Sequence, residues 1–195
     1  MMIEYLGIPG SGKTTIMRQQ IEEYKRQDVK YQDLSRYKGM PMWLKVFYKL
    51  ADYAVYMLPK YKKQMTALRE VCKGCPSEPK YLPFSLDYCI KDIVQATLLQ
   101  DAFGGGKRLV LNDEGQMLRV VFLCVQYGAD VNAIMKCLNV PSLVKTEYVK
   151  VDAETAYQRI KARNRHVCPM DELSDERLME YLKDTENVCE LVMRK

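Results

Sequence analysis

Short apolar runs alternate along the chain with longer stretches in which apolar residues recur at helical spacing. A short apolar run bounded by turn-forming residues is typical of a buried strand, whereas recurrence at i, i+3, i+4 and i+7 predicts a helix. The pattern predicts strands at residues 2–6, 29–33, 108–112 and within 143–151, and helices at 15–21, 117–127, 131–138, 153–163 and after Ser174. This alternation predicts an α/β fold with a mostly parallel sheet and helices on both faces.

The longest helical region is predicted at residues 41–102, with breaks at Pro59 and at 74–83, where turn-forming residues gather. Its last part carries an apolar stripe at helical spacing, formed by Leu86, Ile90, Ile93, Val94 and Leu98. The helix at 117–127 is apolar nearly all round, so we expect it to be buried, with Gly128 just past its end.

Length and composition favour a single globular domain spanning residues 1–195, with 48% hydrophobic and 28% charged residues. The net charge of +5 is mild, and no block of Lys and Arg with interleaved aromatics suggests a nucleic-acid partner. A strand that begins near residue 3 leaves no room for a secretory signal, so we expect a cytoplasmic protein.

The most apolar stretch, residues 40–58, contains Lys45, Lys49 and Asp52 and is therefore a poor membrane span. We favour a helix packed over the core or a substrate pocket. An amphipathic helix that contacts a membrane surface through residues 41–58, with Trp43 among the lysines, is the alternative. Pairing into a homodimer also stays open.

Seven cysteines in a chain without an export signal are expected to be reduced thiols. Cys72 and Cys75 have the spacing of a zinc knuckle, and His166 with Cys168 could complete four ligands. Because the second pair is not another CxxC, a loop that carries two free thiols is the default interpretation.

A complete phosphate-binding loop follows the first predicted strand and precedes a helix, which is the context that this motif requires. The predicted nucleotide-binding residues are Gly7, Ile8, Pro9, Gly10, Ser11, Gly12, Lys13, Thr14 and Thr15. Inward-turned backbone N–H groups and the helix N-terminus favour phosphate oxygens. Lys13 can reach the β- and γ-phosphates of ATP, and the Thr14 hydroxyl can hold Mg²⁺. An ordinary glycine-rich turn is the alternative.

Two carboxylates, Asp113 and Glu114, follow the third predicted strand at the sheet edge where the phosphate loop opens. We assign Asp113 to the metal and Glu114 to a catalytic role, against the alternative of a solvated turn.

A third group consists of Arg159, Arg163 and Arg165, of which the first two share a helix face. Cations there could close over a γ-phosphate as part of a lid at about residues 163–174. The alternative is a basic helix end that complements its own dipole.

With these three groups the chain resembles the P-loop kinases of nucleosides and nucleoside monophosphates, most closely the thymidylate and deoxynucleoside kinases. The matching segments are 7–14, Asp113 with Glu114, and 151–165. The resemblance implies a three-layer P-loop NTPase with parallel strands in the order 2-3-1-4 plus a fifth, an acceptor-binding helical region at 41–102, and a lid.

By position, the resemblance implies that Lys13 binds phosphate and Thr14 binds Mg²⁺. It also implies that Arg163 and Arg165 stabilise the charge of the transition state, and that Asp33 lies near the acceptor hydroxyl. Arg119 could contact the acceptor or be a surface cation.

Two departures from the resembled family stand out. The acceptor-site triplets Asp-Arg-Tyr/Phe and Glu-Arg-Ser are replaced by Asp113-Glu114-Gly115, which leaves the acceptor open. Secondly, no clear fifth strand follows the last helix. Residues 190–194 could supply it, the sheet could have four strands, or the sequence could be a shortened product.

The sequence therefore predicts an ATP- and Mg²⁺-dependent kinase that acts on a small-molecule acceptor such as a nucleoside, nucleotide or sugar. Two other functions are retained: an NTP-hydrolysing switch or assembly factor that uses Glu114 to activate water, and a nucleotide-binding module without chemistry.

Overall fold

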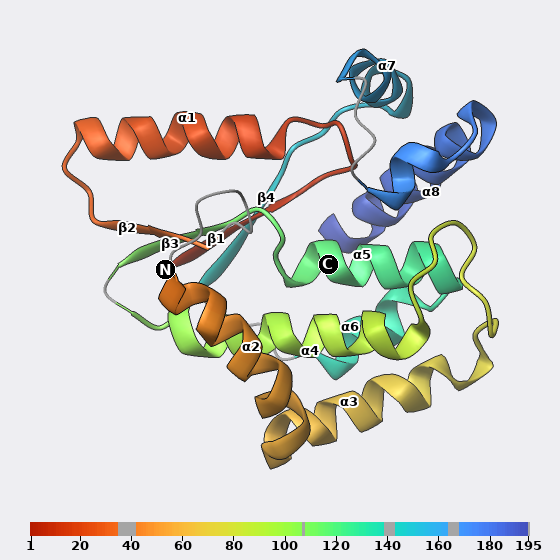
Figure 1. Cartoon of the computed structure of the whole chain (residues 1–195), viewed down its shortest axis with the longest axis horizontal. Coiled ribbons are helices and arrows are strands. Elements are labelled where there is room, and N and C mark those ends of the chain that lie inside the picture. Colours follow the sequence, from red (N-terminus) through yellow and green to blue (C-terminus); the bar gives the residue numbers. More distant parts are fainter. Residues whose placement is uncertain (35–41, 107, 139–142, 164–167, 195) are drawn as a thin grey trace.

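A computed structural model describes residues 1–34, 42–106, 108–138, 143–163 and 168–194. Within these ranges, four strands form one parallel sheet in the order β2-β3-β1-β4. The strands are β1 (Met2–Leu6), β2 (Tyr31–Asp33), β3 (Leu109–Asn112) and β4 (Val144–Tyr148). The predicted strand order and α/β class are confirmed (Figure 1).

The helices begin and end close to the positions that the apolar periodicity predicts. They are α1 (Lys13–Arg26), α2 (Met42–Met57), α3 (Pro59–Val71), α4 (Leu86–Phe103), α5 (Gln116–Tyr127), α6 (Val131–Cys137), α7 (Ala153–Arg163) and α8 (Asp175–Met193), with short 3-10 turns η1 (Cys72–Gly74) and η2 (Pro169–Glu172). None of the described helices is both long and apolar enough to cross a bilayer.

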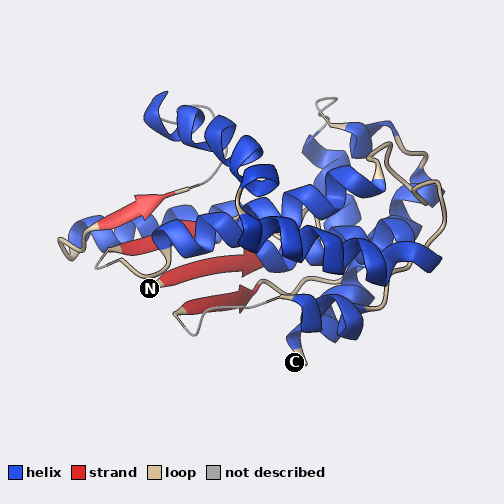
Figure 2. Cartoon of the chain, turned by 90° about the horizontal axis from the view of Figure 1, so that it is seen from below, coloured by secondary structure: helices blue, strands red, loops and turns tan. Residues whose placement is uncertain are grey.

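Helices cover both faces of the sheet. Figure 1 shows α1 on one side and α4 and α5 on the other, and Figure 2 shows the strands lying side by side between them. Alternate residues of β1 serve the two faces: Ile3 and Tyr5 pack with Met17 of α1, whereas Leu6 joins the larger core of α4 and α5. The central strand is therefore apolar on both sides, as expected for a covered parallel sheet.

The structure of the C-terminal segment excludes one alternative that the sequence left open, a fifth strand at residues 190–194. Residues 190–194 do not supply a strand, because α8 continues as a helix through Met193. Cys189 and Val192 are buried on the stripe that begins at Leu178 and Tyr181, and α8 packs against α5 and α7. Apolar residues at helical spacing keep this segment helical, and the described part of the sheet has four strands.

A buried carboxylate fixes the start of α5. Glu4 is 1% exposed, and its Oε2 accepts the backbone N–H of Gln116 at 3.0 Å while its Oε1 accepts a hydrogen bond from Gln100 Nε2 at 3.0 Å. A negative group at a helix N-terminus is stabilised by the helix dipole. Gly115 allows the close approach, since a Cβ at this position would overlap the Glu4 carboxylate. This contact ties α5, and the residues that α5 carries, to the central strand.

Candidate functional site

The loop between β1 and α1 has the backbone of a phosphate cradle. Gly10 and Gly12 have φ angles of 82° and 97°, in the left-handed region that glycine adopts without strain. A Cβ on Gly10 would also lie 2.7 Å from the Ala156 carbonyl oxygen of α7. The motif therefore needs glycine here for two reasons, conformation and close packing.

Lys13 folds back over this loop. Its Nζ donates hydrogen bonds to the carbonyl oxygens of Gly7 at 2.6 Å and Ile8 at 3.1 Å. Burial lowers the pKa of Lys13 to about 8, against the opposing influence of Cys189, Asp113 and neighbouring groups. The ammonium is thus held beside the cradle in an environment that disfavours its charge, and an anion there would relieve that cost.

Asp113 lies directly across from Thr14, as the sequence predicts for a metal site. The Thr14 hydroxyl donates to Asp113 Oδ2 at 3.2 Å, and Asp113 is 3% exposed. Burial, and to a smaller extent the charge of Glu114, raise the pKa of Asp113 to about 6 against the opposing effect of the Thr14 hydrogen bond. Asp113 Oδ1 is buried, and among the residues that the structure describes it has no hydrogen-bond partner. A hydroxyl and a carboxylate oxygen with unused capacity are ligands that suit Mg²⁺.

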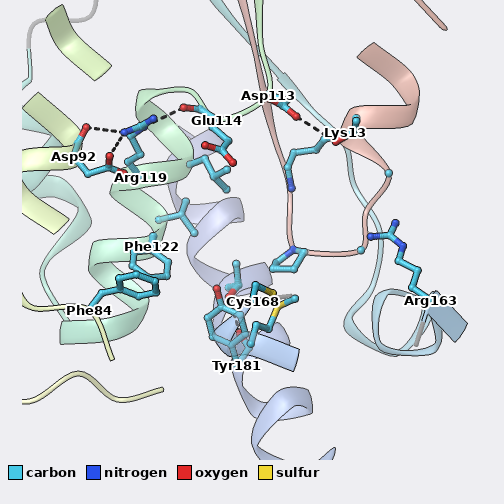
Figure 3. A pocket seen from close by; sticks show the side chains of 18 of the residues that line it. Lys13, Phe84, Asp92, Asp113, Glu114, Arg119, Phe122, Arg163, Cys168 and Tyr181 are labelled. Carbon is cyan, nitrogen blue, oxygen red and sulfur yellow. Dashed lines mark hydrogen bonds and ion pairs between the residues drawn. The ribbon is translucent and has the colours of Figure 1, made fainter. Parts of the chain in front are cut away.

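A cavity of about 600 Å³ opens from this loop. On the loop side it is lined by Pro9, Gly10, Gly12, Lys13, Thr14, Asp113, Glu114 and Arg163. On the other side, aromatic and apolar side chains line it, including Phe84, Tyr88, Leu118, Phe122, Met170 and Tyr181. In Figure 3 the loop with Lys13 lies on one side, and Phe84 and Phe122 lie across the cavity from it. One continuous pocket therefore joins a phosphate cradle to an apolar compartment.

Arg119 lies on α5, on the same side of the cavity as Phe122, and the alternative that it is a surface cation is wrong. It is 5% exposed and lines the pocket. Its Nη1 pairs with the Asp92 carboxylate and donates to the Asp92 carbonyl oxygen at 3.0 Å, and its Nε donates to the Glu114 carbonyl oxygen at 3.0 Å (Figure 3). The guanidinium thus links α4, α5 and the end of β3.

The aromatic compartment has a defined geometry. Phe84 stacks on Tyr88 with ring centroids 5.2 Å apart and 25° between planes, and it meets Phe122 edge-on at 5.5 Å. Offset-stacked and edge-on arrangements are the favourable ones for aromatic pairs. The sequence pattern does not predict Phe84, Phe122 or Asp92 as site residues. An arginine in an otherwise apolar helix was a signal that a buried acidic partner exists, but it could not say which one.

The arginines predicted for a lid are placed differently from one another. Arg163 lines the pocket from α7, on the far side of the loop from Arg119 (Figure 3). Arg159 does not line the pocket: its Nη1 donates to the Ser11 carbonyl oxygen at 3.2 Å and to the Gly10 carbonyl oxygen at 3.4 Å, so it supports the loop from behind. Arg165 lies outside the described residues, as does part of the predicted lid segment at about 163–174.

The remaining predicted site residues do not line the cavity. Ile8 and Ser11 are buried beneath the loop, Thr15 is exposed on the first turn of α1, and Asp33 is exposed at the end of β2. The charge of Asp33 nonetheless contributes to the raised pKa of Asp113, which places it near the same sheet edge. Gly7 contributes its carbonyl oxygen to Lys13 rather than a surface to the pocket.

The proposed zinc set is divided between different surroundings. Cys72 is buried in the core, whereas Cys168 lines the pocket and its Sγ donates to Asp171 Oδ2 at 3.2 Å. His166 lies outside the described residues. Among the residues that the structure describes, no three His, Cys, Asp or Glu side chains are grouped as metal ligands.

Comparisons with known proteins show no family for this chain. No family model and no curated protein sequence matches the chain. Two solved structures are similar over the whole chain: deoxyadenosine kinase from M. mycoides with bound dATP (TM-score 0.46, 18% identity, 84% of that chain covered) and the same enzyme with the products dCMP and a flexible dCDP (TM-score 0.48, 17% identity, 84% covered). Because both TM-scores are below 0.5, the function proposed below depends on the loop and the pocket alone.

Together, the parallel sheet of order 2-3-1-4 and the glycine-rich loop between β1 and α1 define the fold as that of the P-loop class.

Proposed function

We propose that this chain is a phosphotransferase that moves the γ-phosphoryl group of a nucleoside triphosphate, taken here as ATP, to a small-molecule acceptor. One observation carries the proposal: the phosphate loop and the apolar compartment are parts of one cavity of about 600 Å³. A volume of this size accommodates a drug-sized molecule in addition to a phosphate group.

In this proposal each group near the loop has a separate task. Backbone N–H groups and Lys13 bind the β- and γ-phosphates, and Arg163 adds positive charge from α7. Thr14 and Asp113 would hold Mg²⁺, which when bound neutralises charge on the phosphates. Thr14 and Asp113 are already adjacent, joined by a hydrogen bond of 3.2 Å. Arg165, outside the described residues, is proposed for the same role as Arg163.

The acceptor would occupy the aromatic compartment beside α4 and α5, of which only α4 belongs to the acceptor-binding region predicted at residues 41–102. Phe84 and Phe122 offer edges and faces to a ring or an apolar body. Arg119, held by Asp92 and the Glu114 carbonyl, contributes a fixed guanidinium to the same cavity. Glu114 is proposed as the base that accepts the proton of the acceptor hydroxyl, and Asp33 as a second carboxylate near it.

The test is a coupled ADP-release screen with Mg·ATP over nucleosides, nucleotides, sugars and amino alcohols. Lys13→Met serves as the blank, and Leu191→Gln, an exposed position on α8, serves as a matched surface control. The proposal expects acceptor-dependent release that Lys13→Met abolishes and Leu191→Gln leaves unchanged. Release that is equally fast in Lys13→Met would refute it.

Acceptor-free hydrolysis is the second candidate, because the Glu114 side chain lines the pocket beside Asp113 and could orient a water molecule. The same screen separates the two. Turnover without any acceptor, unchanged across the panel and lost in Glu114→Gln, would favour an NTP-hydrolysing switch. Nucleotide binding without turnover would favour a binding module.

A further inference from the structure

Helix α2 is apolar on two opposite faces, and only one of them is used by the fold. Ala51 and Val55 are buried where α2 packs against α3 and α4. The opposite face exposes an outer stripe formed by Met42, Trp43, Val46, Leu50, Tyr53 and Met57. Exposed fractions on this stripe run from 48% at Val46 to 79% at Met57. Contiguous exposed apolar surface of this kind marks an interaction site.

The residues of the outer stripe follow the periodicity of the helix and are not scattered around it. From Trp43 to Met57 the stripe residues recur at alternating steps of three and four, so they share one side of the helix, and Tyr56, which is 50% exposed, lies next to this side. Lys45 and Lys49 each precede a stripe residue and are exposed beside it. The surface therefore combines an apolar strip with cationic flanks.

The charges around the outer stripe are almost all positive. Helix α2 and the first turn of α3 contain five lysines and a single acid, Asp52. Asp52 is already paired with Lys91 at 3.0 Å, and Lys60 is paired with Asp101 at 2.6 Å. Within the described residues, the other lysines, namely Lys45, Lys49, Lys62 and Lys63, have no acidic partner.

The positive charge beside the outer stripe distinguishes between two possible binding partners, a second copy of the chain and an anionic lipid surface. A second copy of the chain placed on the outer stripe would bring lysines against lysines, with no free acid to pair across a helix seam. An anionic lipid surface supplies the complementary charge along the whole helix. Trp and Tyr side chains are also the ones that bilayer–water interfaces favour, and the stripe contains Trp43 and Tyr53.

We propose that α2 docks the protein on anionic lipid membranes, with the outer stripe in the headgroup region and Lys45 and Lys49 against lipid phosphates. The helix lies in the plane of the interface, since it does not span the bilayer and its opposite face stays on the protein core. The inference is independent of the chemistry in the pocket.

Trp43 is the only tryptophan of the chain, so its fluorescence reports this contact directly. The full chain is titrated with vesicles of phosphatidylcholine alone and with vesicles of equal parts phosphatidylcholine and phosphatidylglycerol. We expect a blue shift, and quenching by chain-brominated lipid, with the anionic vesicles, both weakened by added salt. No spectral change with phosphatidylglycerol, together with no cosedimentation, would overturn the proposal.

Variants separate the apolar and the charged contributions. Leu50→Glu should weaken partitioning at least about tenfold, from the loss of one buried leucine. Leu191→Glu, at an exposed leucine on α8, is the matched control and should partition like the parent. Lys45→Gln and Lys49→Gln should each weaken binding about fivefold on anionic vesicles only.

The same probe tests the competing occupant. A blue shift that grows with protein concentration in lipid-free buffer, together with a doubled mass in sedimentation velocity, would assign the outer stripe to a second copy and overturn the lipid proposal. A constant monomer mass with a lipid-dependent shift supports it. Equal partitioning of Leu50→Glu and Leu191→Glu would also contradict it.

Discussion

Replacing Asp113 by Asn should stabilise the nucleotide-free protein while removing its dependence on Mg²⁺. Asp113 is 3% exposed, and burial raises its pKa from 3.8 to about 6. A shift of this size corresponds to about 3 kcal/mol between the two protonation states. Because a neutral amide does not carry that cost, and can still accept the Thr14 hydrogen bond, we expect a gain of about 1–3 kcal/mol near neutral pH.

The sign of the pH dependence makes the prediction specific. A carboxyl whose pKa is raised on folding binds more protons in the native state, so its contribution to stability falls as pH rises from about 4 to above 6. The advantage of Asp113→Asn over the parent should therefore be full near pH 8 and absent near pH 4. Denaturant unfolding of both proteins across this range measures it.

Ligand should reverse the order of stability. If Asp113 holds Mg²⁺, added Mg·ATP stabilises the parent by mass action and leaves the Asn variant nearly unchanged. An Asn variant that is less stable than the parent at every pH would refute the electrostatic reasoning. Equal stabilisation of the two proteins by Mg·ATP would refute the assignment of the metal.

Three further predictions concern residues around the pocket. Gly115→Ala should lower the free energy of unfolding by about 3 kcal/mol, because the new Cβ displaces the buried Glu4 carboxylate from the start of α5. In the double variant, Glu4→Ala should cancel part of that loss, and additive losses in denaturant unfolding would be evidence against the clash. Arg119→Met should cost about 2 kcal/mol, because it removes the buried ion pair with Asp92 and the hydrogen bond to the Glu114 carbonyl oxygen, and it should raise the acceptor KM. Arg119→Lys should not restore the KM, since a lysine cannot reproduce the contacts of Nε and Nη1, and rescue by lysine would show that only charge matters. Burial lowers the pKa of Lys13 to about 8, and a bound phosphate should raise it, so nucleotide binding near pH 8 should be accompanied by proton uptake onto Lys13. The binding heat should therefore depend on the ionisation enthalpy of the buffer, and a heat that does not depend on the buffer would place Lys13 away from the phosphates.

The local periodicity of the sequence was sufficient to predict most of the fold. The predicted positions of the strands and helices and the buried helix α5 agree with the structure. Local side chains also cap two of the helices, since Asp152 accepts the Thr155 N–H and Ser174 accepts the Arg177 N–H. These features depend on residues close together in the chain, where spacing determines which face is apolar. The phosphate loop is also predictable from the sequence, since its turn and the helix start that follows it are formed by neighbouring residues.

The acceptor side of the pocket could not be predicted in this way. Arg119 and Asp92 are 27 residues apart and meet only because α4 packs on α5. Glu4 lies in the middle of an apolar strand, and its function as a helix cap depends on Gly115 far along the chain. Such pairings are tertiary, and a single sequence does not indicate which polar residue meets which.

Calorimetric titration with Mg·ATP tests the central claim most directly, namely that the loop between β1 and α1 binds a triphosphate. The account predicts saturable one-site binding to the parent that is weakened at least about a hundredfold in Lys13→Met and in Gly10→Ala, the latter because a Cβ would meet the α7 backbone 2.7 Å away. Unfolding measurements on the same variants establish that they are folded. Heats no larger than dilution for the parent, or unchanged affinity in both folded variants, would contradict it.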